Sequence, residues 1–151
     1  MQISQSKLSL GCGRRPVEGC VNHDRIQHAP WVDIAHDLNI YPWPWMTGQF
    51  EEVYALDVLE HLDNFVGALE EVWRILKPGG LLHLRVPYFA HIFSHRDPTH
   101  KWFCTLESMD YFVEGTDLEE EYGFYSPMRW KKLSAEYVGS GENIQFELVK
   151  C

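Results

Sequence analysis

A short apolar segment that runs directly into a glycine turn constrains this chain more than any other feature. Leu8 and Leu10 alternate with a polar residue, as in a strand, and Gly11-Cys12-Gly13 follows at once. Glycine has no Cβ and tolerates positive φ, so the backbone of such a turn can approach a ligand closely. Because Gly-x-Gly also occurs in ordinary turns, the segment gains its meaning from the residues that follow it.

Three further short strands, each ending in an aspartate, are predicted at residues 20–24, 32–37 and 52–57. In an open parallel sheet, ligands bind beyond the carboxyl ends of the strands. Each aspartate alone reads equally well as a loop residue or a helix cap. Together with the glycine turn, however, the three aspartates predict a single crevice at one edge of the sheet.

The side chains expected at this edge suit a nucleoside. Asp24 has two carboxylate oxygens for a ribose diol, and Asp37 can accept from an adenine amino group while Leu38 packs against the ring. A dinucleotide is disfavoured, because Pro16 stands where G-x-G-x-x-G needs its third glycine and Asp24 comes only eleven residues after Gly13. The P-loop pattern is absent from the sequence.

The clearest helix is predicted over residues 64–76. Asp63 is its expected N-cap and Pro78-Gly79-Gly80 its expected end. Its predicted apolar stripe consists of Val66, Leu69, Trp73 and Leu76. By contrast, the connection from Gly13 to Asp24 is too short for a crossover helix, so we expect a loop or a single helical turn there.

The rest of the chain completes a sheet. The remaining predicted elements are strands at residues 7–12 and 81–86, an irregular segment at 88–104, a short helix at 105–112, an ambiguous acidic segment at 118–125, and an antiparallel hairpin of residues 129–138 and 143–150. Strands separated by crossovers and closed by a hairpin imply a mainly parallel α/β sheet covered on both faces. The length of 151 residues fits a single domain, residues 1–151.

The composition limits the kinds of molecule with which this protein is expected to interact. The formal net charge of −9 disfavours nucleic acid, and the only basic doublets are Arg14-Arg15 and Lys131-Lys132. The four cysteines show no C-x-x-C spacing, which indicates free thiols in a reducing compartment. The sequence shows neither a signal peptide nor an apolar run of membrane-spanning length. We therefore expect a cytoplasmic protein with no membrane partner.

Five motifs in this order resemble the class I S-adenosylmethionine-dependent methyltransferases. They are Leu10-Gly11-Cys12-Gly13, Val21-Asn22-His23-Asp24, His36-Asp37-Leu38, Asp57-Val58-Leu59-Glu60-His61-Leu62 and Ile75-Leu76-Lys77-Pro78-Gly79-Gly80. Asp97-Pro98-Thr99-His100, followed by Phe103-Cys104-Thr105, also resembles a segment of this group. The resemblance covers residues 7 to 112 and implies a Rossmann-like seven-stranded sheet, in the order 3-2-1-4-5-7-6 with an antiparallel last strand.

The resemblance also implies S-adenosylmethionine as cofactor, with S-adenosylhomocysteine as product. The Gly11-Cys12-Gly13 turn would pass beneath the methionine part, Asp24 would bind the ribose, and Asp37 with Leu38 would bind the adenine. Asp57 and Val58 would lie near the methionine moiety. The chain departs from the family pattern in two places: the helix before the first strand is missing, and the crossover after Gly13 is nearly absent.

Histidines are the candidates for catalysis. Methyl transfer mainly requires positioning of the acceptor, and it needs a base only where the acceptor must lose a proton. We predict His61, His95 and His100 as catalytic residues. The spacing of His91, His95, Asp97 and His100 would also suit a divalent metal. Substrate-binding, acid–base and structural hydrogen-bonding roles stay open for this loop, and we assign no metal ligand.

The leading hypothesis is methyl transfer from S-adenosylmethionine to a small-molecule acceptor. Two alternatives differ in class: a non-catalytic cofactor-binding module that acts with a partner protein, and an enzyme that cleaves S-adenosylmethionine. A homodimer is one arrangement that would hide part of the aromatic surface.

Overall fold

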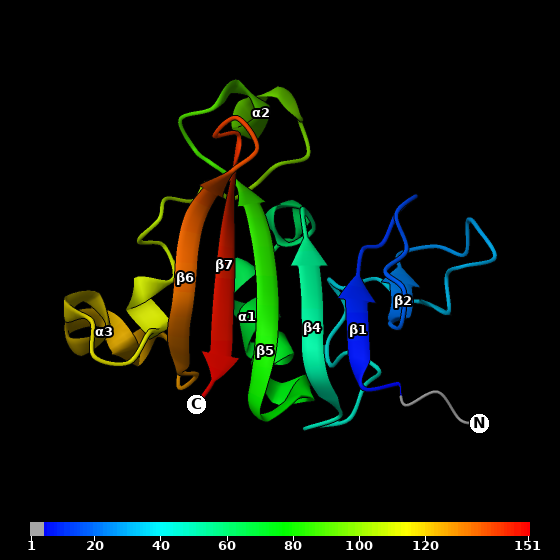
Figure 1. Cartoon of the computed structure of the whole chain (residues 1–151), viewed down its shortest axis with the longest axis horizontal. Coiled ribbons are helices and arrows are strands. Elements are labelled where there is room, and N and C mark those ends of the chain that lie inside the picture. The colour runs from blue at the N-terminus through cyan, green and yellow to red at the C-terminus, as the bar shows by residue number, and fades with distance from the viewer. Residues whose placement is uncertain (1–4) are drawn as a thin grey trace.

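The computed structural model describes residues 5–151, and a single seven-stranded sheet is its centre. The strands are β1 (Lys7–Leu10), β2 (Val21–Asp24), β3 (Ile34–Ala35), β4 (Phe50–Leu56), β5 (Leu76–Pro87), β6 (Trp130–Val138) and β7 (Asn143–Lys150). They lie in the order β3-β2-β1-β4-β5-β7-β6, and β7 runs antiparallel to both β5 and β6 (Figure 1). This confirms the predicted Rossmann-like class I fold. The expected absence of a helix before the first strand falls partly on residues 1–4, outside the described residues.

Helix α1 (Phe65–Ile75) connects β4 to β5. Its N-cap is Asn64 and not the predicted Asp63, since Asn64 Oδ1 accepts a hydrogen bond from the Gly67 N–H at 2.8 Å. The helix ends before Pro78-Gly79-Gly80, because Leu76 already pairs with Phe50 as the first residue of β5. In the predicted stripe, Leu69 and Leu76 are buried but Val66 and Trp73 are only partly so; the buried positions of the helix are Phe65, Ala68, Leu69, Val72 and Ile75.

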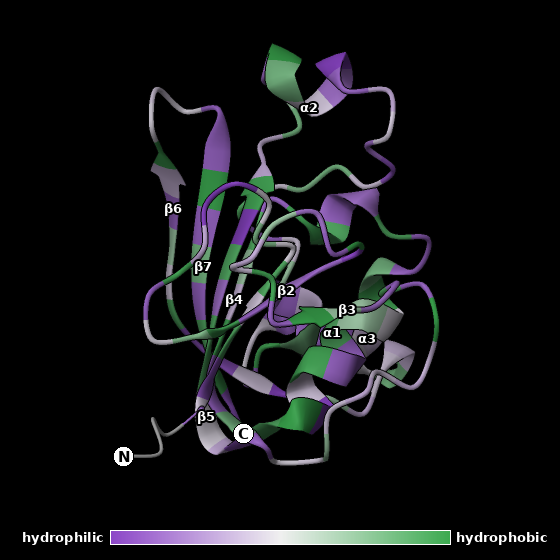
Figure 2. Ribbon diagram, turned by 90° about the vertical axis from the view of Figure 1, so that its right-hand side faces the viewer, coloured by the Kyte–Doolittle hydropathy of each residue, from purple (hydrophilic) through white to green (hydrophobic). Residues whose placement is uncertain are grey.

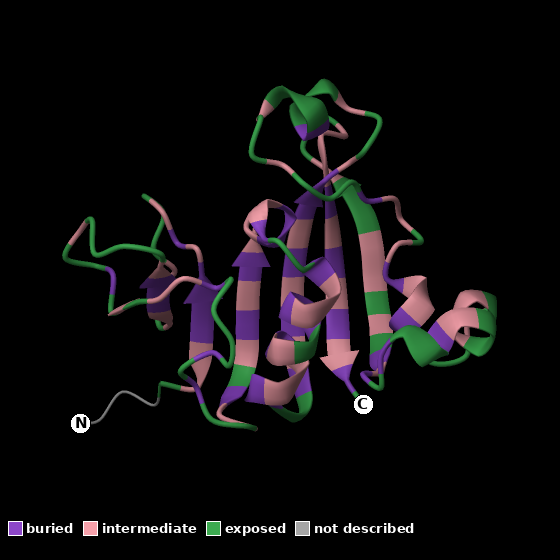
Figure 3. Ribbon diagram, turned by 180° about the vertical axis from the view of Figure 1, so that it is seen from behind, coloured by how far each residue is buried: buried purple, intermediate pink, exposed green. Residues whose placement is uncertain are grey.

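Within the described residues, helices cover the sheet on one face only, which corrects the expectation of cover on both faces. Helix α1 lies behind the sheet in Figure 1 and in front of it in Figure 3. The face that α1 covers is apolar, whereas the other face, called the open face below, carries the half-buried side chains of Glu52, Tyr54, His83, Arg85, Gln145 and Glu147. Figure 2 shows the resulting alternation of hydrophobic and hydrophilic bands along β7.

The loops between the first three strands explain the open face. The connections from β1 to β2 and from β2 to β3 contain no helix in the described residues, as predicted for the segment after Gly13. Successive side chains of a strand point to opposite faces, so the polar residues of β4, β5 and β7 all fall on the side without a helix. A polar face needs no apolar cover to be stable in water.

The long connection from β5 to β6 contains several short elements. They are α2 (Ile92–Arg96), the 3₁₀ turn η2 (Asp110–Phe112), α3 (Asp117–Tyr122) and the 3₁₀ turn η3 (Gly123–Tyr125). The predicted irregular segment 88–104 therefore contains one turn-and-a-half of helix. The predicted helix at 105–112 is wrong except for its last three residues, which form η2. The ambiguous segment 118–125 forms α3 and η3.

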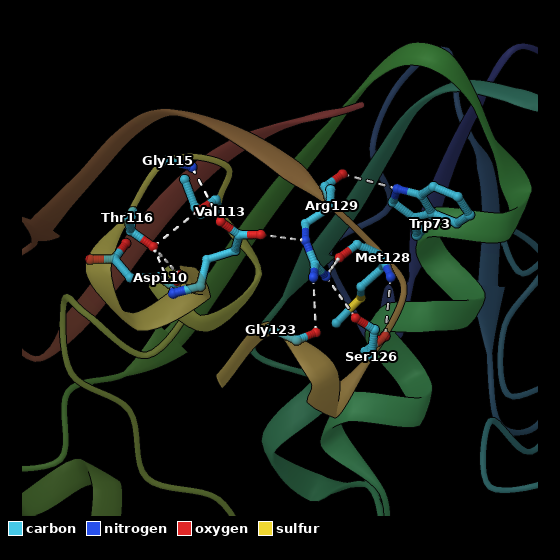
Figure 4. Close-up of polar contacts among 10 residues, drawn as sticks. Trp73, Asp110, Val113, Gly115, Thr116, Gly123, Ser126, Met128 and Arg129 are labelled. Carbon is cyan, nitrogen blue, oxygen red and sulfur yellow. Dashed lines mark hydrogen bonds and ion pairs between the residues drawn. The ribbon is translucent and has the colours of Figure 1, made fainter. Parts of the chain in front are cut away.

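Arg129 holds the end of this connection together (Figure 4). Its guanidinium donates to Glu119 Oε1 at 2.9 Å and to the carbonyl oxygens of Gly123 at 2.9 Å and Ser126 at 2.6 Å. The Arg129 carbonyl in turn accepts from Trp73 Nε1 at 3.0 Å. A single residue thus connects α3 and η3 to α1.

The state of the four cysteines agrees with the prediction of free thiols. Cys12, Cys20, Cys104 and Cys151 are all free, and burial raises the pKa of Cys104 to about 11. None of the helices in residues 5–151 is long and apolar enough to cross a membrane.

Candidate functional site

A cavity of about 350 Å³ opens beyond the carboxyl ends of the strands β1 to β4. Most of the residues predicted to bind a cofactor line it: Gly11, Gly13, Asp24, Asp37, Leu38, Asp57 and Val58. Cys12 is buried and lines a neighbouring hollow instead. The cavity is also lined by residues to which the sequence analysis assigned no role, namely His23, Arg25, His36, Asn39 and Leu62.

The glycine turn forms one wall of the cavity. Gly11 and Gly13 have φ values of 59° and 54°, in the left-handed region that favours glycine. A Cβ on Gly11 would lie 2.6 Å from Val58 Cγ2, whereas a Cβ on Gly13 would meet nothing within 4 Å. Gly11 therefore permits close packing of the turn on the segment after β4, and Gly13 borders open space.

His23, on β2, stabilises the glycine turn through a hydrogen bond to its backbone. The Gly11 N–H donates to His23 Nδ1 at 3.2 Å, and His23 Nε2 donates to the His36 carbonyl at 2.8 Å. This pattern requires the neutral ring protonated on Nε2. Burial lowers the pKa of His23, which favours the same form.

Asp24 is held at the end of β2 by three hydrogen bonds. Oδ2 accepts from the Gly13 N–H at 2.8 Å and from His28 Nε2 at 2.9 Å, and Oδ1 accepts from the Arg25 N–H at 2.6 Å. Burial acts to raise the pKa of Asp24, but the bonds from His28, Arg25 and Gly13 outweigh it and lower the pKa. The ionised carboxylate keeps one acceptor position on Oδ1, and displacement of His28 would free a second one for a diol.

Asp37 and Leu38 lie on the far side of the cavity. Asp37 Oδ1 accepts from the Asn39 N–H at 2.9 Å, and Arg25 Nη2 lies 3.6 Å from Asp37 Oδ2. Leu38 is buried, and its carbonyl accepts from Trp43 Nε1 at 3.0 Å. This corner therefore offers an apolar surface beside a carboxylate.

Asp57 occupies a strained position directly after β4. Its φ is 59°, which is rare for a residue with a Cβ and is often found at functional sites. Oδ2 accepts from Arg85 Nη2 at 2.6 Å and from Arg85 Nε at 3.0 Å. Oδ1 is buried and has no hydrogen-bond partner in the part of the chain that the structure describes. A ligand ammonium group would satisfy this oxygen.

The predicted catalytic histidines do not all lie together. His61 lines the cavity, and the centre of the His100 ring lies 4.7 Å from that of His61. His95 is exposed; its Nε2 donates to the Phe89 carbonyl at 2.7 Å and its ring stacks on Phe103. Burial and the proximity of His100 lower the pKa of His61.

Glu60, to which the sequence analysis assigned no role, lies beside both His61 and His100. It is fully buried in the 3₁₀ turn η1 (Leu59–His61), and burial raises its pKa to about 8. Its Oε1 lies 3.8 Å from His61 Nε2 and 3.9 Å from His100 Nε2. Within residues 5–151 neither carboxylate oxygen has a hydrogen-bond partner.

Comparisons with known proteins agree with this arrangement. Residues 22–84 match the model of a family described as a methyltransferase domain. The fold is similar to a chain of the complex between the Haloferax volcanii Trm112 methyltransferase activator and a methyltransferase, with TM-score 0.68, 13% identity, and 97% of this chain and 82% of that chain covered. No curated protein sequence matches this chain.

Two further solved structures are similar. A SAM-dependent methyltransferase from Thermotoga maritima has TM-score 0.66 and 16% identity, with 96% of this chain and 82% of that chain covered. Another from Archaeoglobus fulgidus has TM-score 0.62 and 15% identity, with 96% and 85% covered. At these identities the likeness establishes the fold.

The site itself fits the cofactor of this class. Asp24 has acceptor positions for hydroxyl groups, Leu38 and Asp37 offer an apolar surface beside a carboxylate, and Asp57 Oδ1 is a buried oxygen without a partner in the described chain. These features match a ribose, an adenine and an ammonium group. The match over residues 22–84 and the fold show that the chain is similar to methyltransferase domains and has the Rossmann-like class I methyltransferase fold, and its cavity fits S-adenosylmethionine.

Proposed function

We propose that the protein, acting as one domain, methylates a small molecule. The observation that carries this proposal is the gathering of Gly11, Asp24, Asp37 and Asp57 around one cavity beyond the strand ends. The net charge of −9 supports a small-molecule acceptor, since an acidic surface repels phosphate backbones. The free cysteines support work in a reducing compartment such as the cytoplasm.

In this proposal the chain mainly positions the two reactants. When bound, S-adenosylmethionine supplies an electrophilic sulfonium methyl. Asp24 and Asp37 orient its nucleoside end, and Gly11 and Asp57 orient its amino-acid end, so the methyl group faces a fixed direction. We propose that His61, on the cavity wall, faces the acceptor and that His100 supports it. We assign His95 to shaping the loop, because it is bonded to the Phe89 carbonyl.

Calorimetric titration with S-adenosylmethionine and S-adenosylhomocysteine tests the cofactor contacts. We expect wild type to bind both ligands and Asp24→Ala to bind them about tenfold or more weakly, since hydrogen bonds to a charged group are lost. The matched control is Asp117→Ala, an exposed carboxylate on α3 that does not line the cavity. Folded wild type that binds neither ligand would contradict the proposal.

Product analysis separates methyl transfer from its two rivals. Incubation with S-adenosylmethionine and a panel of hydroxyl and amine acceptors is expected to yield S-adenosylhomocysteine only when an acceptor is present. Methylthioadenosine or a homoserine product without an acceptor would instead indicate cleavage of the cofactor. Tight binding without any product, together with a stable partner protein, would indicate a non-catalytic module.

A further inference from the structure

Three potential metal ligands lie together beside the cofactor cavity. Glu60 and His61 come from η1, and His100 comes from the loop that follows α2. One ligand atom from each of the three lies within 4.8 Å of the other two. We propose that Glu60, His61 and His100 bind a divalent transition-metal ion, and that Zn²⁺ is the ion that best suits this donor set.

Glu60 is the strongest reason for this proposal. The residue is 0% exposed, and neither of its carboxylate oxygens has a hydrogen-bond partner among the described residues. Buried carboxylates in proteins are normally paired, hydrogen-bonded or bound to a metal. An ion between Glu60 and the two imidazoles would provide the missing partner.

Both histidines are held in the tautomer that a metal requires. His100 Nδ1 donates to the Ser94 carbonyl at 2.9 Å, which leaves the lone pair on Nε2. Thr99 Oγ1 donates its proton to Asp97 Oδ1 at 2.8 Å and therefore accepts from His61 Nδ1 at 2.7 Å. The lone pair of His61 is thus also on Nε2, and each Nε2 is the atom within 4 Å of Glu60.

Such hydrogen bonds to the remote ring nitrogen are typical of metal-binding histidines. In His61 the bond leads through a hydroxyl to a carboxylate, and in His100 it leads to a backbone carbonyl. The backbone also joins the two ligand segments, since the Lys101 N–H donates to the Glu60 carbonyl at 2.8 Å. Hydrogen bonds therefore hold both ligand segments in place before any ion binds.

The geometry and donor types favour Zn²⁺ over Mg²⁺ or Ca²⁺. A tetrahedral ion with bonds of about 2.0–2.1 Å places its ligands roughly 3.4 Å apart. The observed separations of 3.8 and 3.9 Å from Glu60 Oε1 need only a small contraction. Two imidazoles and one carboxylate are borderline ligands that suit zinc, whereas Mg²⁺ and Ca²⁺ prefer oxygen donors.

Three protein ligands leave one tetrahedral position for water or for an oxygen or nitrogen of a bound molecule. Since His61 also lines the cofactor cavity, the metal site and the cavity share a wall. The proposal depends on this geometry and not on methyl transfer, so its test measures the ion directly.

The test is zinc titration of the full chain after chelator treatment, in competition with a chromophoric chelator. Elemental analysis of the same samples gives the stoichiometry. We expect wild type to bind one Zn²⁺ per chain and Glu60→Gln to lose this site. Thr99→Val, which removes the hydroxyl that links His61 to Asp97, should bind roughly 10–100-fold more weakly. Thr99 is exposed, so this variant tests the proposal even where Glu60→Gln fails to fold.

The matched control is His83→Gln, which alters a histidine on the open face of β5 outside the cluster and should bind zinc like wild type. Zinc should also raise the thermal midpoint of wild type but not that of Glu60→Gln. The absorption of the Co²⁺-substituted protein should show tetrahedral ligand-field bands without thiolate charge transfer. Absence of bound zinc in wild type, thiolate bands, or equal affinity in Glu60→Gln, Thr99→Val and wild type would overturn the proposal.

Discussion

At the scale of single residues, Gly11 is the position at which the glycine turn packs against Val58. Gly11→Ala adds a Cβ that would lie 2.6 Å from Val58 Cγ2, in addition to the strain of a positive φ. We expect Gly11→Ala to lower the free energy of unfolding by about 1–3 kcal/mol more than Gly13→Ala. Urea denaturation of the ligand-free variants measures this difference.

Gly13→Ala is the matched control, because Gly13 has the same sign of φ but open space at the added Cβ. Val58→Ala in the Gly11→Ala background should recover part of the loss. Equal losses in the two single variants would show that the contact with Val58 does not limit the turn.

His23 should make stability depend on pH. Its pKa is lowered by burial from 6.5, so the unfolded chain takes up a proton at a higher pH than the folded protein does. The stabilising contribution is thus complete above about pH 6.5 and decreases as the pH falls toward the folded pKa. Protonation would also remove the acceptor for the Gly11 N–H.

Urea denaturation between about pH 5 and pH 8 measures this dependence. We expect a shallower decrease in His23→Gln than in wild type, with a residual slope from His61, whose pKa is also lowered. An identical slope in His23→Gln and wild type would contradict the assignment.

The strand-end aspartates could be predicted from sequence because each follows an apolar strand within a few residues. Glu60 and His23 could not, since their importance depends on partners far along the chain. Glu60 becomes a possible ligand only when the loop after α2 brings His100 beside it. The adjacent Glu60-His61 pair, following the strained Asp57, is the only local signal.

At the scale of elements, Arg129 connects the β5–β6 segment to the helix layer. Arg129→Lys removes the planar fork that reaches Glu119, Gly123 and Ser126 together. We expect faster hydrogen exchange over residues 110–128, unchanged exchange in β7, and a loss of about 1–3 kcal/mol in unfolding free energy. Exchange measured by mass spectrometry checks this.

The control for Arg129→Lys is Lys131→Gln, which changes a neighbouring exposed cation on β6. We expect wild-type exchange in that variant. Faster exchange throughout the sheet in Arg129→Lys would mean that the residue supports the whole fold and not the segment.

Among the elements, the hairpin was predicted well, but two strands have other bounds than predicted: the strand expected at 81–86 begins at Leu76, and the one expected at 32–37 is only Ile34–Ala35. The β6–β7 hairpin follows from its alternation and its glycine turn, both local features. The end of α1 depends on tertiary pairing, because Leu76 joins β4 through Phe50 although its sequence would continue the helix. The N-cap of α1 depends on a single side chain, and both Asp63 and Asn64 are residue types that can cap a helix.

At the scale of the whole molecule, adjacent leucines on β5 test the one-sided core. Leu82 is fully buried toward α1, whereas Leu81 is half-buried on the open face. We expect Leu82→Ala to cost about 2–5 kcal/mol, as for a core leucine, and Leu81→Ala to cost about 1 kcal/mol or less. Urea denaturation at two protein concentrations measures both values.

The two variants are matched in residue type and strand. Equal losses would contradict a free open face, and a loss at Leu81 that grows with protein concentration would show that a second copy covers it. The predicted cover on both faces failed because it was inferred from the parallel strands alone. The polar alternation in β4, β5 and β7 was already visible in the sequence and indicated the opposite.

The open face also affects how the protein responds to temperature. The heat capacity change on unfolding grows with the apolar surface that unfolding exposes and shrinks with the polar surface. A sheet whose second face stays polar and wet exposes less new apolar surface than a sheet enclosed between two helix layers. We therefore expect a flatter curve of stability against temperature for this chain than for an enclosed domain of equal length, so that stability decreases more gradually on both cooling and heating.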